Sequence, residues 1–156
     1  MKNYTTAEKA AITRALNIIA DKGPCDPETM LTSPTVTAKH ARLEYERLAD
    51  FEREHFMVIY ANAQHHYIAC DVLFSGTIDG AAVYPREIVR SVIKHNACAV
   101  VLVHNHPSGM VLPSISDKRI TARIADALRL IDVRVLDHLI INETGEHYSF
   151  AEKGEM

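Results

Sequence analysis

Two histidines, a serine and an aspartate fall within a short stretch in the second half of the sequence. His104 and His106 end an apolar run, and Ser114 and Asp117 follow after a Pro-Ser-Gly turn. Residues two apart on a strand point to the same side of the sheet, so we expect both imidazoles to aim at one point beyond its edge. Asp117 is the candidate third ligand. Two imidazoles and one carboxylate leave a fourth position of Zn²⁺ open for water, as catalytic zinc sites do.

The chemistry expected of such a site is hydrolysis. Zinc lowers the pKa of a bound water to about 7, and a carboxylate base would complete a hydrolase. The nine histidines of the chain make a His-x-His pair weak evidence by itself, and serine and aspartate often serve only to cap a helix. The metal site is favoured because the pair ends a strand with no other polar side chain, where two idle buried imidazoles would be costly.

The hydrophobic pattern predicts the elements that position these residues. Helical spacing and capping signals predict helices at residues 5–20, 34–48, from 85 onward and 116–130, the last capped by Ser116. Apolar runs predict strands at residues 56–60, 67–74, 97–103, 133–141 and 147–150. The helix that starts at residue 85 is expected to bury Ile88, Val89, Val92 and Ile93. The run 97–103 is apolar throughout, so we expect it to be a central strand that leads into the two histidines.

Length and composition are those of one ordinary globular domain with a short N-terminal extension. The chain has 156 residues, of which 47% are hydrophobic and 24% charged, and this is enough to bury a core. Residues 23–34 hold three prolines, so we expect a helix and linker over 1–32 and one domain over 33–156. No apolar run is long enough to cross a bilayer and no signal-peptide core follows Met1, which predicts a cytoplasmic protein.

The cysteines and the charge balance narrow the function further. Three widely spaced cysteines fit neither a disulfide framework nor a cysteine zinc site. The net charge of −3 gives the whole molecule no attraction to nucleic acid. Arg86, Arg90 and Lys94 form a basic stripe at helical spacing. We therefore expect DNA binding, where it occurs, to be weak, salt-sensitive and indifferent to sequence.

The candidate metal-binding residues resemble a known motif. The string His104-x-His106-Pro107-Ser108-Gly109, followed by Pro113-Ser114-x-x-Asp117, resembles the JAMM zinc motif as it occurs in RadC-like proteins, members of the JAB/MPN metalloprotease superfamily. Four further stretches are similar to those of RadC-like sequences, namely Arg53-Glu54-His55-Phe56, Gly76-Thr77, Tyr84-Pro85-Arg86-Glu87 and Asp137-His138. The resemblance covers about residues 33–152, which is most of the chain.

The resemblance implies a fold, a site and an activity. The implied fold is α+β, a curved mixed β-sheet flanked by helices in three layers, as in JAB/MPN and cytidine-deaminase-like proteins. His104, His106 and Asp117 would bind Zn²⁺, Ser114 would help to stabilise a tetrahedral oxyanion, and Glu54 would be the general base. The implied activity is that of a zinc metallopeptidase or isopeptidase acting on a peptide or protein substrate. Longer RadC-like proteins carry an N-terminal helix-hairpin-helix module, and this sequence resembles the short form without it.

Other functions and another base remain open. The main alternative function is a DNA-repair accessory protein whose zinc site is structural or vestigial. A zinc base deaminase is less favoured, because the sequence has no Pro-Cys-x-x-Cys pair. Glu87 competes with Glu54 as the base, but in the first turn of a helix it is explained by the helix dipole. No feature of the sequence indicates an oligomeric state.

Overall fold

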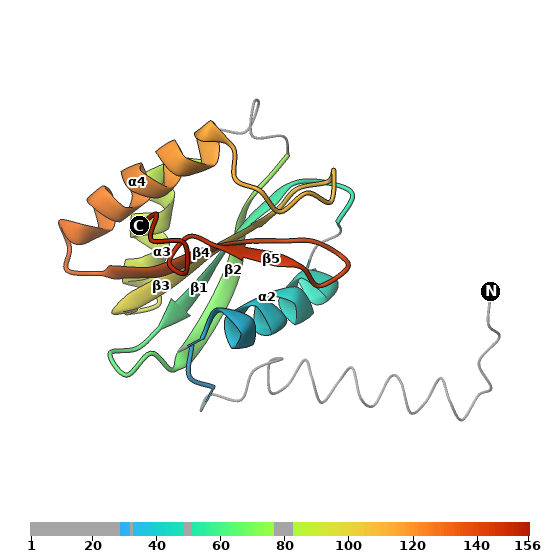
Figure 1. The fold of residues 1–156 in the computed structure, drawn as a ribbon. Helices are drawn as coiled ribbons and strands as arrows, with labels where there is room; N and C mark the ends of the chain where they lie inside the picture. Colours follow the sequence, from blue (N-terminus) through green and yellow to red (C-terminus); the bar gives the residue numbers. More distant parts are fainter. Residues whose placement is uncertain (1–28, 32, 49–50, 77–82) are drawn as a thin grey trace, which may run out of the picture.

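The computed structural model describes residues 29–31, 33–48, 51–76 and 83–156 (Figure 1). Within these ranges five strands form one sheet and three helices pack on it. The helices are α2 (Pro34–Leu48), α3 (Pro85–Lys94) and α4 (Ile115–Arg129), and the strands are β1 (His55–Ala61), β2 (Tyr67–Ser75), β3 (Ala99–Asn105), β4 (Arg134–Ile141) and β5 (His147–Ser149). None of the described helices is both long and apolar enough to span a bilayer. The helix expected at residues 5–20 lies outside the described residues.

The sheet is mixed, with the strand order β2-β1-β3-β4-β5 and β3 at its centre. β1 pairs antiparallel with both β2 and β3, β3 pairs parallel with β4, and β4 pairs antiparallel with β5. Every residue of β3 is buried, as expected of an apolar strand that is covered on both faces. The predicted central strand is confirmed, and it extends to Asn105 so that His104 lies within it.

Alternate residues of the central strands face different helices, which gives three layers (Figure 1). Met57 and Val101 pack in the core that α2 covers, whereas Phe56 and Leu102 pack in the core that α3 and α4 cover. Because side chains alternate along a strand, His104 follows Leu102 onto the face of α3 and α4. Its imidazole therefore lies on the side of the sheet where α4 begins.

The implied α+β fold is confirmed, and two local predictions are wrong. Ser114, not Ser116, caps α4, because the Ser114 hydroxyl is the one that accepts the backbone N–H of Asp117. Ile93, which the hydrophobic pattern places inside, is 65% exposed. It follows the buried Val92 by one residue, and one step along a helix rotates a side chain by about 100°.

Candidate metal centre

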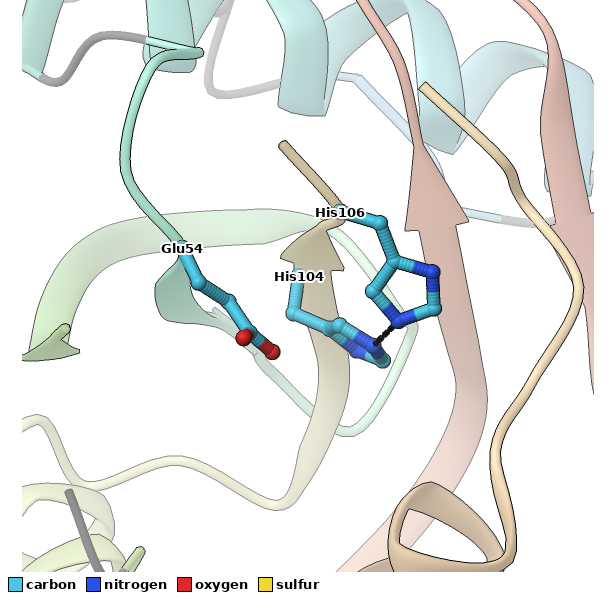
Figure 2. A group of neighbouring side chains, drawn as sticks. All are labelled: Glu54, His104 and His106. Atoms are coloured by element: carbon cyan, nitrogen blue, oxygen red, sulfur yellow. Dashed lines mark hydrogen bonds between the residues drawn. The ribbon is translucent and has the colours of Figure 1, made fainter. Parts of the chain in front are cut away.

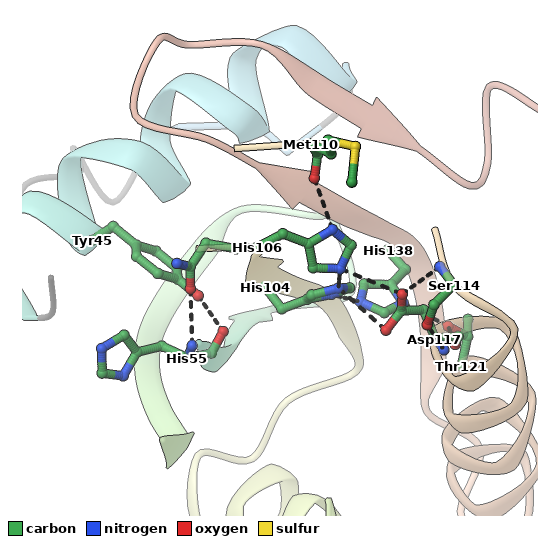
Figure 3. A network of polar contacts seen from close by, with 10 residues as sticks. Tyr45, His55, His104, His106, Met110, Ser114, Asp117, Thr121 and His138 are labelled. Atoms are coloured by element: carbon green, nitrogen blue, oxygen red, sulfur yellow. Dashed lines mark hydrogen bonds and ion pairs between the residues drawn. The ribbon is translucent and has the colours of Figure 1, made fainter. Parts of the chain in front are cut away.

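His104 and His106 bring their Nε2 atoms together at the end of β3 (Figure 3). The two Nε2 atoms lie 3.0 Å apart. Asp117 approaches them from the first turn of α4, with Oδ1 3.3 Å from His104 Nε2 and Oδ2 3.4 Å from His106 Nε2. The three side chains that the sequence proposes as metal ligands thus lie together, and their candidate ligand atoms converge.

In each of the two imidazoles the second ring nitrogen, Nδ1, also makes a hydrogen bond. His106 Nδ1 lies 2.7 Å from the Met110 carbonyl oxygen, which can only accept, so Nδ1–H donates and Nε2 of the neutral ring keeps its lone pair. His104 Nδ1 lies 2.8 Å from Nε2 of His138. Metal-binding histidines commonly hold their second nitrogen in this way, because the bond fixes the orientation of the ring.

The electrostatics of the cluster favour an ionised carboxylate facing a neutral imidazole. Burial raises the pKa of Asp117, but the contacts with His104 and His106 outweigh it and hold that pKa well below its usual range. Burial lowers the pKa of His104 against the opposing effect of Asp117. Asp117 raises the pKa of the less buried His106. An anionic carboxylate and a neutral buried imidazole are the protonation states that a bound cation requires.

The start of α4 holds Asp117 in place. The Ser114 N–H donates to Asp117 Oδ2 at 2.6 Å, and the Asp117 N–H donates to Ser114 Oγ at 3.1 Å, which forms a reciprocal capping box. The Asp117 side chain is completely buried. The predicted oxyanion role of Ser114 stays a prediction, since in this structure the serine acts as the helix cap.

Glu54 reaches the same point from the start of β1. Phe56 of β1 pairs with His104 of β3, and continuing this register by two residues places Glu54 opposite His106. One ligand atom from each of Glu54, His104 and His106 lies within 4.8 Å of the others, and Figure 2 shows the carboxylate directed toward the imidazoles. This group also fits Glu54 as a metal ligand. Asp117 is favoured as the ligand because its oxygens lie within 3.4 Å of both Nε2 atoms.

Asn105, a residue that the sequence analysis missed, ties the Glu54 segment to the histidine pair. Its side chain is buried, with Oδ1 accepting the His55 N–H at 2.9 Å and Nδ2 donating to the Arg53 carbonyl at 2.9 Å. The Tyr45 hydroxyl donates to the carbonyl of His55. The backbone on both sides of Glu54 is thereby fixed. The sequence shows an amide that can both donate and accept between two candidate ligands, but it does not show the distant segment that this amide contacts.

His138 and Thr121 form a buried support behind His104 (Figure 3). The His138 ring is fully buried, and its Nδ1 lies 2.6 Å from Thr121 Oγ1. Burial lowers the pKa of His138 well below its usual value, and the nearby His104 lowers it further. Composition and spacing indicate only a surface or structural role for His138. Its contact with His104 depends on the parallel pairing of β3 with β4, which the sequence does not reveal.

A hollow opens beside the histidine pair. It has a volume of about 450 Å³. Its lining residues are Phe51, Glu52, His106, Pro107, Gly109 and Glu143. The His106 side chain is partly exposed, whereas His104 is almost completely buried. The cluster is therefore accessible to solvent from the side of His106.

Glu87, the other candidate for the general base, forms ion pairs with the basic stripe on α3. Glu87 forms ion pairs with Arg90 at 2.7 Å and with Arg86 at 3.6 Å. Glu87 does not belong to the cluster of potential metal ligands found among the described residues. Because two of the three basic side chains already have an acidic partner, the stripe offers less charge to a phosphate than the sequence indicates.

The donor set fits a divalent cation. The two Nε2 atoms lie 3.0 Å apart, and when both rings are neutral with their protons on Nδ1, the facing lone pairs repel each other unless positive charge lies between them. Asp117 Oδ1 is buried beside them and makes no hydrogen bond to any described residue. Two imidazoles and a carboxylate are ligands typical of catalytic Zn²⁺.

Comparison with known sequences finds close relatives. The sequence model of the family described as RadC-like JAB domain matches residues 31–155. A UPF0758 protein of Aliivibrio fischeri strain MJ11 is 50% identical over 129 residues, which are 83% of this chain and 56% of that protein. A UPF0758 protein of Tolumonas auensis is 53% identical over 124 residues, which are 80% and 54% of the two chains. This chain therefore spans about half the length of these curated relatives.

The matched region includes Glu54 and all of the residues that converge on the two Nε2 atoms. The mixed sheet, the helices on its two faces and the spacing of the histidines, the serine and the aspartate agree with that match. The resemblance stated from the motif is thus confirmed, and the chain belongs to the RadC-like JAB domain family.

Proposed function

We propose that this chain is a zinc-dependent hydrolase that cleaves peptide or isopeptide bonds, with His104, His106 and Asp117 as the zinc ligands. The observation that carries the proposal is the convergence of two Nε2 atoms, 3.0 Å apart, with both carboxylate oxygens of Asp117. Membership of the RadC-like JAB domain family supports it, because proteins of the JAB superfamily are often metallohydrolases. The expected cytoplasmic location fits this proposal.

The proposed reaction uses Glu54 as general base and then as general acid. Bound Zn²⁺ would supply a Lewis acid that acidifies water and polarises the substrate carbonyl. Glu54 takes a proton from the attacking water, whose oxygen forms a bond to the carbonyl carbon. As the C–N bond breaks, Glu54 gives this proton to the leaving amine. Ser114 Oγ is an acceptor in its bond with the Asp117 N–H, so its own proton is available to the oxyanion.

Two features of the structure suit this reaction. The bonds from Asn105 to the backbone at His55 and Arg53 hold Glu54 in position, and positioning is a large part of what an enzyme contributes. The hollow beside His106 has room for the residues that flank the scissile bond. The substrate we propose is a peptide or a protein.

Metal content and hydrolysis, measured on the same preparation, test the proposal. The protein is stripped with a chelator, reconstituted with Zn²⁺, and assayed against a panel of fluorogenic peptides and isopeptides. We expect about one zinc per chain, because three protein ligands and water make one open site, and hydrolysis only by the reconstituted protein. The absence of stoichiometric divalent metal after reconstitution would overturn the proposal.

The same preparation separates the proposal from the DNA-repair alternative. Zinc binding without hydrolysis of any substrate in the panel would favour a structural or vestigial site. Tight, sequence-selective DNA binding at physiological salt would point the same way, whereas we expect only weak binding that weakens further in salt. An Arg90→Glu variant is the control for the α3 stripe, since Arg90 is already paired with Glu87.

A further inference from the structure

A chain of hydrogen bonds with a defined direction runs from the backbone of α4 to His104 (Figure 3). We infer that Thr121 and His138 act as positioning residues that place the proton of His104 on Nδ1, so that Nε2 is left free to bind the metal. Neither residue needs to touch the metal or the substrate for this role. The inference rests on the metal site proposed above.

Thr121 determines which atoms are the donors in this chain of hydrogen bonds. The Thr121 hydroxyl donates to the backbone carbonyl of Asp117 at 2.6 Å. A hydroxyl has one proton and a carbonyl oxygen can only accept, so that proton is committed. Thr121 Oγ1 therefore offers only lone pairs to His138 Nδ1, which lies 2.6 Å away. His138 Nδ1 must be the donor of this bond and must carry a proton.

The position of the proton on His138 then determines the donor in the hydrogen bond with His104. The His138 ring is packed between Phe150, stacked at a centroid distance of 4.9 Å, and Phe56, edge-on at 5.6 Å. In the described part of the chain its hydrogen bonds go only to Thr121 and His104. With Nδ1 protonated, the neutral ring has an acceptor at Nε2. The bond of 2.8 Å between His138 Nε2 and His104 Nδ1 must then be donated by His104.

The consequence for the metal site is the tautomer of His104. Once its Nδ1 carries the proton, its Nε2 presents a lone pair to the point where Asp117 and His106 converge. His106 reaches the same tautomer through a bond from Nδ1 to the Met110 carbonyl. The tautomer of each imidazole is thus fixed by a different contact. A backbone carbonyl fixes that of His106, and two buried side chains, on α4 and β4, fix that of His104.

The tautomer is measured directly in the metal-free protein. Long-range proton–nitrogen NMR correlations of the histidine rings at pH 8 distinguish a protonated ring nitrogen from one with a lone pair. We expect His104 and His138 both to carry their protons on Nδ1. A proton on Nε2 of His104 in the wild-type protein would overturn the inference, whatever the activity of the zinc-loaded protein.

Two pairs of variants test whether the support produces this tautomer. Thr121→Val removes the hydroxyl at nearly constant shape, and Thr121→Ser restores it. His138→Phe keeps an aromatic ring between Phe56 and Phe150 without an acceptor, and His138→Gln restores an acceptor. We expect Thr121→Val and His138→Phe to move the His104 proton toward Nε2 and to weaken zinc binding about 10- to 100-fold in competition with a chelator. The Ser and Gln variants are expected to recover most of both.

The outcomes separate this inference from the proposed function. If the wild-type protein binds no zinc while His104 carries its proton on Nδ1, the proposed function fails and the inferred tautomer stands. If zinc binds but a folded Thr121→Val protein keeps both the wild-type tautomer and the wild-type zinc affinity, the inference alone fails. Far-ultraviolet circular dichroism and thermal melting establish which variants are folded, and Thr121→Val is the milder test should His138→Phe misfold.

Discussion

Two polar clusters of similar composition lie on the face of the sheet that α3 and α4 cover. One is the candidate metal centre at the end of β3. The other joins Tyr60, Asp71, Ser91 and His95 between β1, β2 and α3. Each contains histidine, a hydroxyl group and a carboxylate within hydrogen-bond distance. Residue types alone therefore do not distinguish a metal site from a structural network in this protein.

The two clusters differ in where their hydrogen bonds lead. At α3, Ser91 Oγ donates to Asp71 Oδ2 at 3.0 Å, so the Tyr60 hydroxyl, 2.6 Å away, donates to Ser91. His95 Nε2 lies 2.8 Å from the same carboxylate oxygen and donates to it. Every donor in this cluster finds an acceptor. At the metal centre the Nδ1 atoms of His104 and His106 instead make the hydrogen bonds that lead away from the cluster, and the two Nε2 atoms face each other at 3.0 Å, an arrangement that suits a bound cation.

Matched histidine variants give the largest expected contrast between the clusters. His106→Ala removes one of the converging lone pairs, so we expect the zinc content to fall from about one per chain to nearly none. His95→Ala removes a ring whose nitrogen is already used by Asp71, so we expect zinc to be retained although stability falls. Elemental analysis of both folded variants measures their zinc content and tests this contrast. Equal zinc content in the two would remove the distinction drawn here.

Matched glutamate variants test the division of roles within the metal centre. Glu54→Gln removes the proposed base, so we expect zinc to be retained and turnover to fall by about 10²–10⁴-fold. Glu87→Gln removes a partner of Arg86 and Arg90 on α3, and we expect little change in turnover. The measurement is turnover and zinc content of both variants on a substrate from the panel. Loss of zinc from Glu54→Gln would make Glu54 a ligand instead of the base.

The contrast between the clusters also shows how much of the fold and of the candidate site can be predicted from the sequence. The strands and helices of residues 33–150 are predictable because hydrophobic periodicity is local, and the three proposed ligands are predictable because His104, His106 and Asp117 lie close together along the chain. Glu54 lies far from them in the sequence, and only the family resemblance identified it. Its approach to the histidines depends on the pairing of β1 with β3.

The supporting residues are harder to predict, for physical reasons. Asn105 and His138 act through long-range contacts, across to the Glu54 segment and from β4 to β3. Thr121 lies one helical turn after Asp117, and its role requires knowing which side of α4 faces the sheet. Ser116 and Ser114 are equally good caps by residue type, and only the position of the Asp117 N–H decides between them. The domain boundary at residue 33 stays a prediction.

A double-mutant cycle at the α3 cluster has a smaller expected effect. Ser91→Ala removes the hydroxyl that accepts the proton of the buried Tyr60, so we expect a loss of about 1–3 kcal/mol in the free energy of unfolding. Adding Tyr60→Phe removes that hydroxyl as well, and we expect it to restore part of the loss. Urea unfolding of the two single variants and of the double variant measures the loss in each, with zinc content as the control. Additive losses would show that the two hydroxyls do not stabilise each other.

The smallest expected effect is the dependence of stability on acid at Asp71. Burial alone raises the pKa of Asp71, but the bonds from His95 and Ser91 outweigh it, and the pKa lies below its ordinary value of 3.8. A carboxyl group whose pKa is lowered by folding stabilises the protein above its unfolded pKa, and that contribution is lost as the pH falls through the folded value. The affected window therefore begins near pH 4 and extends downward.

The size of this effect is limited because a third of the Asp71 side chain is exposed, so solvent screens the pair and we expect less than about 1 kcal/mol. Urea unfolding of the wild type and of Asp71→Asn, each at pH 5.5 and at pH 3, measures it. Other groups of the protein, including those of the metal centre, titrate in both proteins, so only the difference between the two pH dependences reports on Asp71. We expect Asp71→Asn to be less stable at pH 5.5 and to lose less stability on acidification. Identical losses in the two proteins would mean that the bonds of the α3 cluster position Asp71 without stabilising its charge, in contrast to the metal centre, where the contacts with His104 and His106 lower the pKa of Asp117.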